Sequence, residues 1–191
     1  MERSIFAKLV FVICIFSVVF ALASEANADT IYFEFKPGAY FPQKGIMKDA
    51  DTGVGTEMAV GYYFHPNIAA ELGVGAYYTR VPFTVTVGPL TDTFKANLWL
   101  YPVTLDLVAS NKIGPFEPYV KAGIGEYFVY RESALFEPSE TKSAFGYQFG
   151  LGAVLFNFGI EGKYLFAEPT ILNQKVKLDG FTFNVFYKMR F

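Results

Sequence analysis

The chain contains very little cysteine, histidine or tryptophan, with one of each among its 191 residues. A lone cysteine, Cys14, cannot form an intramolecular disulfide, and it rules out a metal site built from several thiolates. Charged residues make up only 18% of the chain, and the formal net charge is −2. The sequence has no basic patch and no basic helix, so we exclude nucleic acid as a partner.

Long apolar runs are also absent, except at the N-terminus. Arg3 and Lys8 precede an apolar stretch over residues 9–23. This order of charge and apolar residues is typical of a secretory signal peptide. The alternative is an uncleaved membrane anchor, but the stretch is shorter than the roughly 20 residues that a spanning helix needs. We therefore predict export.

The end of this N-terminal segment contains a small-x-small pattern, Ala26-Asn27-Ala28. Signal peptidases cleave after such a pattern, so we predict a signal peptide over residues 1–28 and one domain over residues 29–191. Cys14 would be removed with the signal peptide. The exported chain would then hold no cysteine.

The remaining sequence alternates between apolar and polar or small residues, which is the signature of strands. In the last segment the apolar row is Phe181, Phe183, Val185, Tyr187, Met189 and Phe191. No later run reaches 18 apolar residues, so no second spanning helix is expected. The pattern predicts eight strands, over residues 30–41, 57–64, 68–79, 96–108, 118–130, 144–155, 158–166 and 179–191.

The connections between these strands are alternately short and long. Short turns are expected at 65–67, at 110–115 and near Asn157. Longer, more polar loops are expected over 42–55, 80–93, 131–143 and 167–179. Short turns at one end and long loops at the other are typical of outer-membrane barrels. The fold class that we predict is all-β, an eight-stranded antiparallel up-and-down transmembrane β-barrel.

The polar rows of the strands distinguish this barrel from a soluble β-sandwich. A sandwich would expose rows rich in Lys, Glu, Thr and Ser, whereas these rows are mostly Gly and Tyr. Their charges balance, five acids against five bases, as a closed and poorly hydrated interior requires. We predict a plugged lumen with an ion-pair network of Glu34, Lys36, Glu57, Glu71, Asp106, Lys121, Glu161, Lys163, Lys188 and Arg190.

The apolar rows would then face lipid, with aromatic residues near both membrane interfaces. Glu126 is the exception, because it falls on the apolar row of its strand. Either a β-bulge shifts the alternation there, or the residue lies beyond the hydrocarbon.

The segments "AELGVGAYYT", "PYVKAGIGEYF", "FGYQFGLGAVL" and the terminal "YKMRF" resemble the small outer-membrane β-barrel family, which includes the OmpA transmembrane domain, OmpX and OmpW. The resemblance implies a location in the bacterial outer membrane, with outer-membrane lipid and lipopolysaccharide as partners. It also implies that the terminal row Tyr187, Met189 and Phe191 is a signal for the outer-membrane assembly machinery.

Two lipid A-modifying enzymes are known on similar barrels, and both use a catalytic His near a Ser. The only histidine, His65, lies in the turn "FHPN", and Asn67 stands where the deacylase pattern has Ser. We therefore predict no enzyme activity. Asp49, Asp51 and Glu57 flank one long loop and could hold Ca²⁺, but we interpret them as a solvated acidic loop. No metal or cofactor is expected.

Two functions remain. The first is a monomeric structural or surface-interaction barrel with a sealed lumen, whose long loops meet partners outside the cell. The alternative is a narrow barrel of the OmpW kind that takes up small hydrophobic molecules. An apolar upper lumen would favour this alternative.

Overall fold

The computed structural model describes residues 30–43, 48–87, 90–132, 140–171, 174–175 and 177–191. Eight long strands are present: β1 (Ile31–Pro42), β2 (Gly53–His65), β3 (Ile68–Val87), β4 (Leu90–Ser110), β5 (Phe116–Arg131), β6 (Glu140–Leu155), β7 (Phe158–Ala167) and β10 (Gly180–Arg190). A separate two-stranded sheet joins β8 (Thr170–Ile171) and β9 (Gln174–Lys175). In these described residues, no helix has the length and apolarity to cross a membrane.

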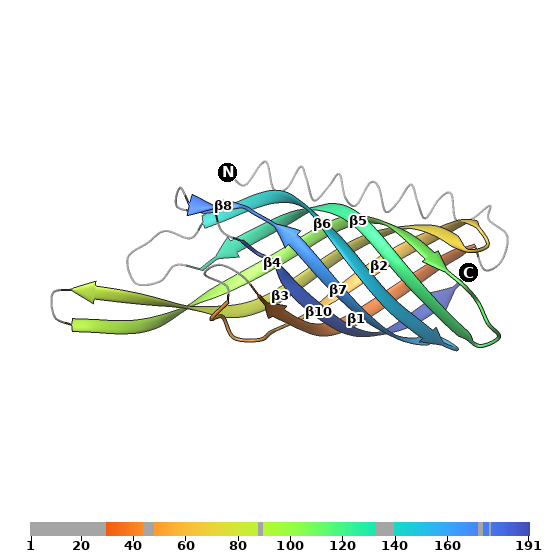
Figure 1. Ribbon diagram of the computed structural model, residues 1–191, viewed down its shortest axis with the longest axis horizontal. Coiled ribbons are helices and arrows are strands. Elements are labelled where there is room, and N and C mark those ends of the chain that lie inside the picture. The colour runs from red at the N-terminus through yellow and green to blue at the C-terminus, as the bar shows by residue number, and fades with distance from the viewer. Residues whose placement is uncertain (1–29, 44–47, 88–89, 133–139, 172–173, 176) are drawn as a thin grey trace.

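The eight long strands form a closed barrel in which each strand pairs antiparallel with its neighbours in sequence (Figure 1). The closing pair joins β1 to β10, with Tyr32 opposite Arg190 and Tyr40 opposite Thr182. The predicted eight-stranded antiparallel barrel is confirmed.

The alternation in sequence becomes an alternation between inside and outside. Along β10, Thr182, Asn184 and Lys188 are buried, whereas Phe183 and Val185 between them are exposed. Because successive side chains point to opposite faces of a strand, one row fills the lumen and the other covers the outer surface.

Glycines on the inner rows make room for tyrosine rings. A Cβ atom at Gly61 would collide with the Tyr32 ring, and one at Gly152 would collide with Tyr119. Both rings are buried in the lumen. The Gly and Tyr content of the polar rows therefore reflects packing in a narrow barrel.

One predicted loop is wrong. Residues 80–93 were expected to form a loop, but β3 continues to Val87 and β4 begins at Leu90. The two strands stay paired as far as Val87 opposite Leu90, and the hairpin extends well beyond the rest of the barrel (Figure 1). Alternation of Val and Phe with Thr and Pro over residues 81–87 explains the strand.

Glu126 lies on the outer row without any bulge. It pairs with Val103 on one side and Phe145 on the other, within an unbroken register. The bulge that we considered is therefore absent here. Among the described residues, a shift in strand register occurs instead in the β2–β3 pair, between Tyr63 and His65.

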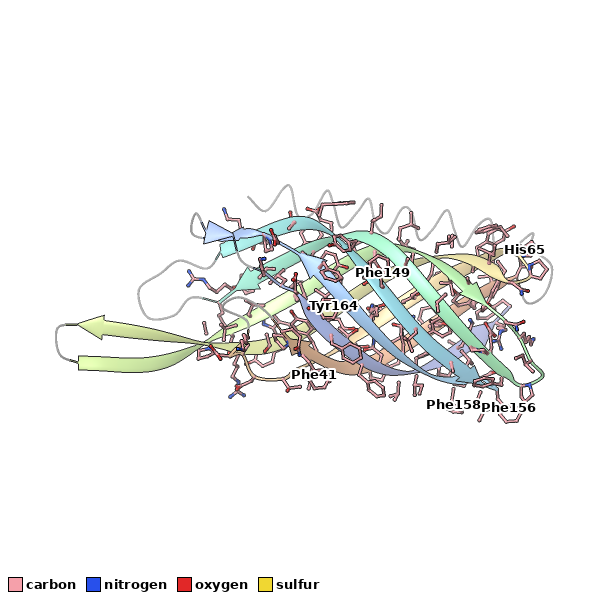
Figure 2. The ribbon with its side chains drawn as sticks, in the orientation of Figure 1. Phe41, His65, Phe149, Phe156, Phe158 and Tyr164 are labelled. Carbon is pink, nitrogen blue, oxygen red and sulfur yellow. The ribbon has the colours of Figure 1, made fainter. Side chains whose placement is uncertain are left out.

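Aromatic side chains gather at the short-turn end of the outer surface, where Phe156 and Phe158 project from the β6–β7 turn (Figure 2). Both are about 70% exposed. Phe156 has a φ of 58°, a left-handed conformation that bulky residues rarely adopt. Its N–H donates to the Pro115 carbonyl of the neighbouring turn, which holds the turn in this shape.

Candidate functional site

The ten charged residues singled out in the sequence all come from inward-facing positions of the barrel strands. Nine of them are at most 3% exposed, and the Arg190 side chain, at 16%, lies near the short-turn rim. Such burial requires partners, because an isolated charge in a poorly hydrated interior costs several kcal/mol.

Lys36 is the centre of this network. Its Nζ lies 2.6 Å from Glu34, 3.1 Å from Glu71 and 3.3 Å from Glu161. Lys121, from the opposite side of the barrel, approaches Glu71 at 3.0 Å and Glu161 at 2.8 Å. Two lysines and two carboxylates thus alternate across the lumen. This arrangement fixes β1, β3, β5 and β7 to one another.

Tyrosine hydroxyl groups complete the hydrogen bonding of these carboxylates. Tyr32 donates to Glu71 and Tyr119 donates to Glu161, each at 2.9 Å. Toward the long loops, Lys163 pairs with Glu57, and Tyr77 donates to Glu57 at 3.4 Å. The Tyr residues of the inner rows are therefore part of the network as well as of the packing.

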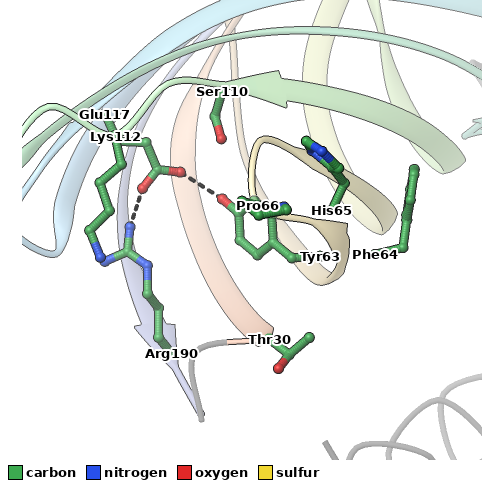
Figure 3. Close-up of a pocket in the computed structure, with 9 residues that line it drawn as sticks. All are labelled: Thr30, Tyr63, Phe64, His65, Pro66, Ser110, Lys112, Glu117 and Arg190. Atoms are coloured by element: carbon green, nitrogen blue, oxygen red, sulfur yellow. Dashed lines mark hydrogen bonds and ion pairs between the residues drawn. The ribbon is translucent and has the colours of Figure 1, made fainter. Parts of the chain in front are cut away.

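At the short-turn end the network surrounds Glu117 (Figure 3). This carboxylate pairs with Arg190, lies 3.3 Å from Lys188 and accepts a 2.6 Å hydrogen bond from Tyr63. Lys188 also lies 3.8 Å from the centre of the Tyr32 ring. Tyr63, Glu117 and Arg190 line a cavity of about 360 Å³ at the mouth of the barrel.

Sequence reasoning missed Glu117, because the predicted strand began one residue later, at Pro118. Glu117 lies two and four residues before Tyr119 and Lys121 and thus shares their inward row; this parity was the available signal. Glu117 and the ten predicted residues together comprise six acids and five bases.

Asp106 is held differently from the other predicted members. Its two carboxylate oxygens accept hydrogen bonds from Gln148 Nε2, at 2.7 and 2.9 Å, and from Thr104 Oγ1 at 3.1 Å. Tyr127 donates in turn to Gln148 at 3.2 Å. Among the described residues, no ion pair with a cation joins this group.

Two clusters of buried, mainly apolar side chains enclose the charged network. The cluster toward the short turns comprises Tyr32, Ala69, Val108, Tyr119, Val154 and Phe186. The cluster toward the long loops comprises Tyr40, Tyr77, Val81, Leu98, Leu100, Tyr127, Val129, Leu165, Ala167 and Leu178. Leu178 comes from the segment before β10, and its carbonyl accepts a 2.6 Å hydrogen bond from Tyr40. Buried side chains thus occupy the lumen on both sides of the charged network.

His65 lies in the β2–β3 turn and shares the mouth cavity with Ser110 and Glu117 (Figure 3). Its Nδ1 accepts a hydrogen bond from the Asn67 amide at 3.3 Å. Glu117 is already bound by Arg190, Lys188 and Tyr63. No hydrogen-bonded Ser–His–acid relay joins these described residues, which is the arrangement that nucleophilic catalysis needs.

Acidic residues do not gather into a metal site in the described part of the chain. Glu57, which could have completed a Ca²⁺ site with Asp49 and Asp51, instead faces the lumen and pairs with Lys163.

A sequence profile described as the outer membrane protein beta-barrel domain matches residues 13–191. The chain belongs to this family. It is accordingly an outer-membrane barrel protein, so the short turns lie at the periplasmic end and the long loops at the extracellular end.

Other comparisons agree with this family. The chain is 38% identical over 78 residues to an uncharacterized outer-membrane protein, y4mB, of Sinorhizobium fredii; the match covers 40% of this chain and 32% of that protein. The chain therefore aligns with only about a third of its relative's length.

One solved structure supports the same fold. Neisserial surface protein A matches 87% of this chain and all of its own, with 13% identity and a TM-score of 0.56. Ail of Yersinia pestis, solved with a heparin analogue, matches 83% of this chain and 96% of its own, with 20% identity and a TM-score of 0.45.

Proposed function

We propose that this outer-membrane barrel is a structural and surface-interaction protein without enzyme activity, whose lumen is sealed and whose extracellular segments meet partners. The observation that carries the proposal is the β3–β4 hairpin. β3 pairs with β2 only as far as Tyr78, and β4 pairs with β5 only from Leu98. The pairing of β3 with β4 continues to Val87 opposite Leu90.

Among the residues that the structure describes, the hairpin beyond the barrel therefore has an unpaired backbone edge on each of its two strands. Unpaired N–H and C=O groups favour pairing with another chain. Apolar and polar residues also alternate along the sequence of the hairpin. Val81, Phe83 and Val85 alternate with Pro82, Thr84 and Thr86, and Phe83 is opposite Phe94. A two-stranded ribbon that extends beyond the barrel (Figure 1) is suited to protein contacts at the cell surface.

The packing of side chains in the lumen supports the same proposal. Ion pairs at the centre and buried clusters above and below leave the barrel packed along its axis. Purified protein in planar lipid bilayers should show no steady conductance. Large, stable openings would contradict the sealed lumen.

Contact through the hairpin can be tested in living cells with a photo-crosslinking amino acid at Thr86. We expect crosslinked adducts at this position and none at Thr104, which faces the lumen. Adducts from the β5–β6 loop, in the absence of adducts from the hairpin, would contradict the role of the hairpin.

A second candidate function is uptake of small hydrophobic molecules, and the buried cluster beneath the extracellular loops is the observation that favours it. Leu178, from the segment before β10, is a fully buried member of this cluster. If uptake occurs, Leu178→Ala should speed the entry of an apolar fluorescent dye such as N-phenylnaphthylamine into cells. Equal rates in wild type and variant would favour the surface-interaction function.

A further inference from the structure

The cavity at the short-turn mouth of the barrel is lined by side chains that mainly donate hydrogen bonds (Figure 3). Glu117 is the one acid among the described residues that line it. Its Oε1 accepts from Tyr63 at 2.6 Å and from Lys188 at 3.3 Å. Its Oε2 is paired with Arg190. Because both carboxylate oxygens are occupied, the side-chain groups that remain for a ligand are donors.

Arg190 and Lys112 are the two cations of this cavity. A guanidinium has five N–H groups. Among the described residues, Arg190 bonds to Glu117 from Nη2 and to the Phe156 carbonyl from Nη1, the latter at 3.4 Å. Lys112, in the β4–β5 turn, is exposed and has no acidic partner in the described part of the chain. In the view of Figure 3 both cations lie on the side of the cavity away from His65. Two cations and one acid give the described lining a net positive charge.

Two neutral donors, Ser110 and His65, complete the set. Both are held by Asn67 in the β2–β3 turn. The Asn67 carbonyl accepts from the Ser110 N–H at 2.8 Å, and the Asn67 N–H donates to His65 Nδ1 at 3.3 Å. Because Nδ1 accepts, the ring proton is assigned to Nε2, which is then a donor. Among the described residues, nothing bonds to this Nε2 or to the Ser110 hydroxyl, so both groups are left for a ligand.

The size and the apolar border of the cavity indicate the kind of anion. Its volume of about 360 Å³ is within the range of small-molecule sites. Phe64 and Pro66 add apolar surface beside the donors. An inorganic anion would leave this surface in water, whereas an organic acid with a small apolar group would cover it. Cations next to neutral donors suit the end of a peptide, where a carboxylate lies close to a peptide carbonyl.

We propose that the periplasmic mouth of the barrel binds the C-terminal carboxylate of a short peptide whose last residue is small and apolar. The carboxylate pairs with Arg190 and Lys112. Ser110 and His65 donate to the peptide carbonyl beside it, and the terminal side chain packs on Phe64. This site lies at the opposite end of the barrel from the β3–β4 hairpin, so its failure and the failure of the function proposed above are distinguishable.

His65 is the only histidine of the chain, so its imidazole NMR signal reports on this cavity directly. The untagged, full-length folded barrel is kept in a maltoside detergent and in a buffer without carboxylate or phosphate. It is titrated at constant pH with N-acetyl-alanyl-alanine or with the C-terminal amide of the same peptide. The acid should shift the His65 signal with a dissociation constant of about 1 mM, an ordinary value for a ligand of about 14 non-hydrogen atoms. Equal shifts from acid and amide, or no shift from the acid at about ten times that concentration, would overturn the proposal.

Inorganic phosphate distinguishes a peptide site from a general anion site. Phosphate supplies negative charge without an apolar group or a peptide carbonyl. We expect it to shift the His65 signal at a several-fold higher concentration than the acid. Phosphate that binds as tightly as the acid would overturn the assignment to a peptide end.

Variants test the donors themselves. Ser110→Ala removes one hydroxyl but keeps the backbone bond to Asn67, and it should weaken binding of the acid roughly fivefold. Lys112→Gln removes an exposed charge and should weaken binding roughly threefold. Lys177→Gln makes the same change at an exposed lysine outside the cavity and is the matched control.

Folding of every variant is checked by its heat-dependent migration on gels. If Ser110→Ala and Lys112→Gln both fold and bind the acid like Lys177→Gln, the cavity does not recognise the carboxylate, and the proposal is wrong.

Discussion

At the scale of single residues, Lys36 is the position on which the interior depends most. Lys36→Met keeps the length of the side chain but leaves Glu34, Glu71 and Glu161 without this shared cation. Breaking a buried ion pair from one side costs about 3–5 kcal/mol, so the free energy of unfolding should fall by about that amount. Urea unfolding in detergent micelles, followed by Trp99 fluorescence, measures the change.

Lys177→Met is the matched control, because Lys177 pairs with Glu168 at 3.5 Å on the surface and is 52% exposed. Exposed pairs contribute about 0–1 kcal/mol. Equal losses in the two variants would show that the lumen network does not stabilise the barrel.

Glu126 is the residue whose position on the outer surface costs stability. Along β5 it lies four residues from Tyr130, toward the membrane centre, and it is paired with Val103 of β4 and Phe145 of β6. Charged residues on the lipid face are destabilising, acids less so than bases. Glu126→Leu should therefore raise the free energy of unfolding in liposomes by about 1–2 kcal/mol. A less stable variant would indicate that Glu126 binds a partner.

The sequence was sufficient to assign the inward or outward side of most residues, because strand alternation is a local property. It was not sufficient for their partners. Whether Asp106 meets a lysine or Gln148 depends on how β4 and β6 are placed across the lumen, and this in turn depends on the registers of all the strands between them.

At the scale of elements, the β3–β4 hairpin should be dispensable for folding. Replacing residues 84–93 with Asn-Gly would join Phe83 to Phe94, which are already opposite each other, through a favoured two-residue turn. Val81, part of the buried upper cluster, is retained. We expect a change of less than about 1 kcal/mol in unfolding free energy, since the barrel pairings remain. Loss of heat-modifiable migration would show that the hairpin is needed for closure.

This hairpin could not be predicted from the sequence, because residues 80–93 have the composition of a loop. Pro82 and the pair Gly88-Pro89 are signals of turns, and Thr and Asp residues add polarity. Pro82 is tolerated because, among the described residues, the pairing of β3 with β2 ends at Tyr78 and only the Arg80 carbonyl beyond it bonds to the segment before β2. Only the Val and Phe alternation indicated a strand, and it competed with stronger turn signals.

At the scale of the whole molecule, we predict that Phe191 governs delivery to the membrane. Its side chain is 62% exposed, and its N–H donates to the Ile31 carbonyl at 2.8 Å. Deletion of Phe191 should leave most of the protein in the periplasm, as measured by membrane fractionation. Phe156→Ala removes an equally exposed aromatic from the same end and should assemble normally. Normal membrane levels without Phe191 would contradict the prediction.

The closed architecture could be predicted from the sequence, because eight alternating segments with short and long connections fit few other folds. The burial of Leu178 beneath the long loops could not be predicted in this way. Leu178 belongs to a segment that reads as a polar loop, and nothing local indicates that its side chain packs among residues from other strands.

The seam between β1 and β10 imposes an order of events on folding. Tyr32 meets Arg190 across almost the full length of the chain, so this pair cannot form until every other strand has been made. Until then the open sheet has two unpaired edge strands. Hydrocarbon cannot form hydrogen bonds with the free backbone groups of these edges. The backbone groups of these edges must therefore be hydrogen-bonded by water or by a helper protein until the last strand pairs with the first.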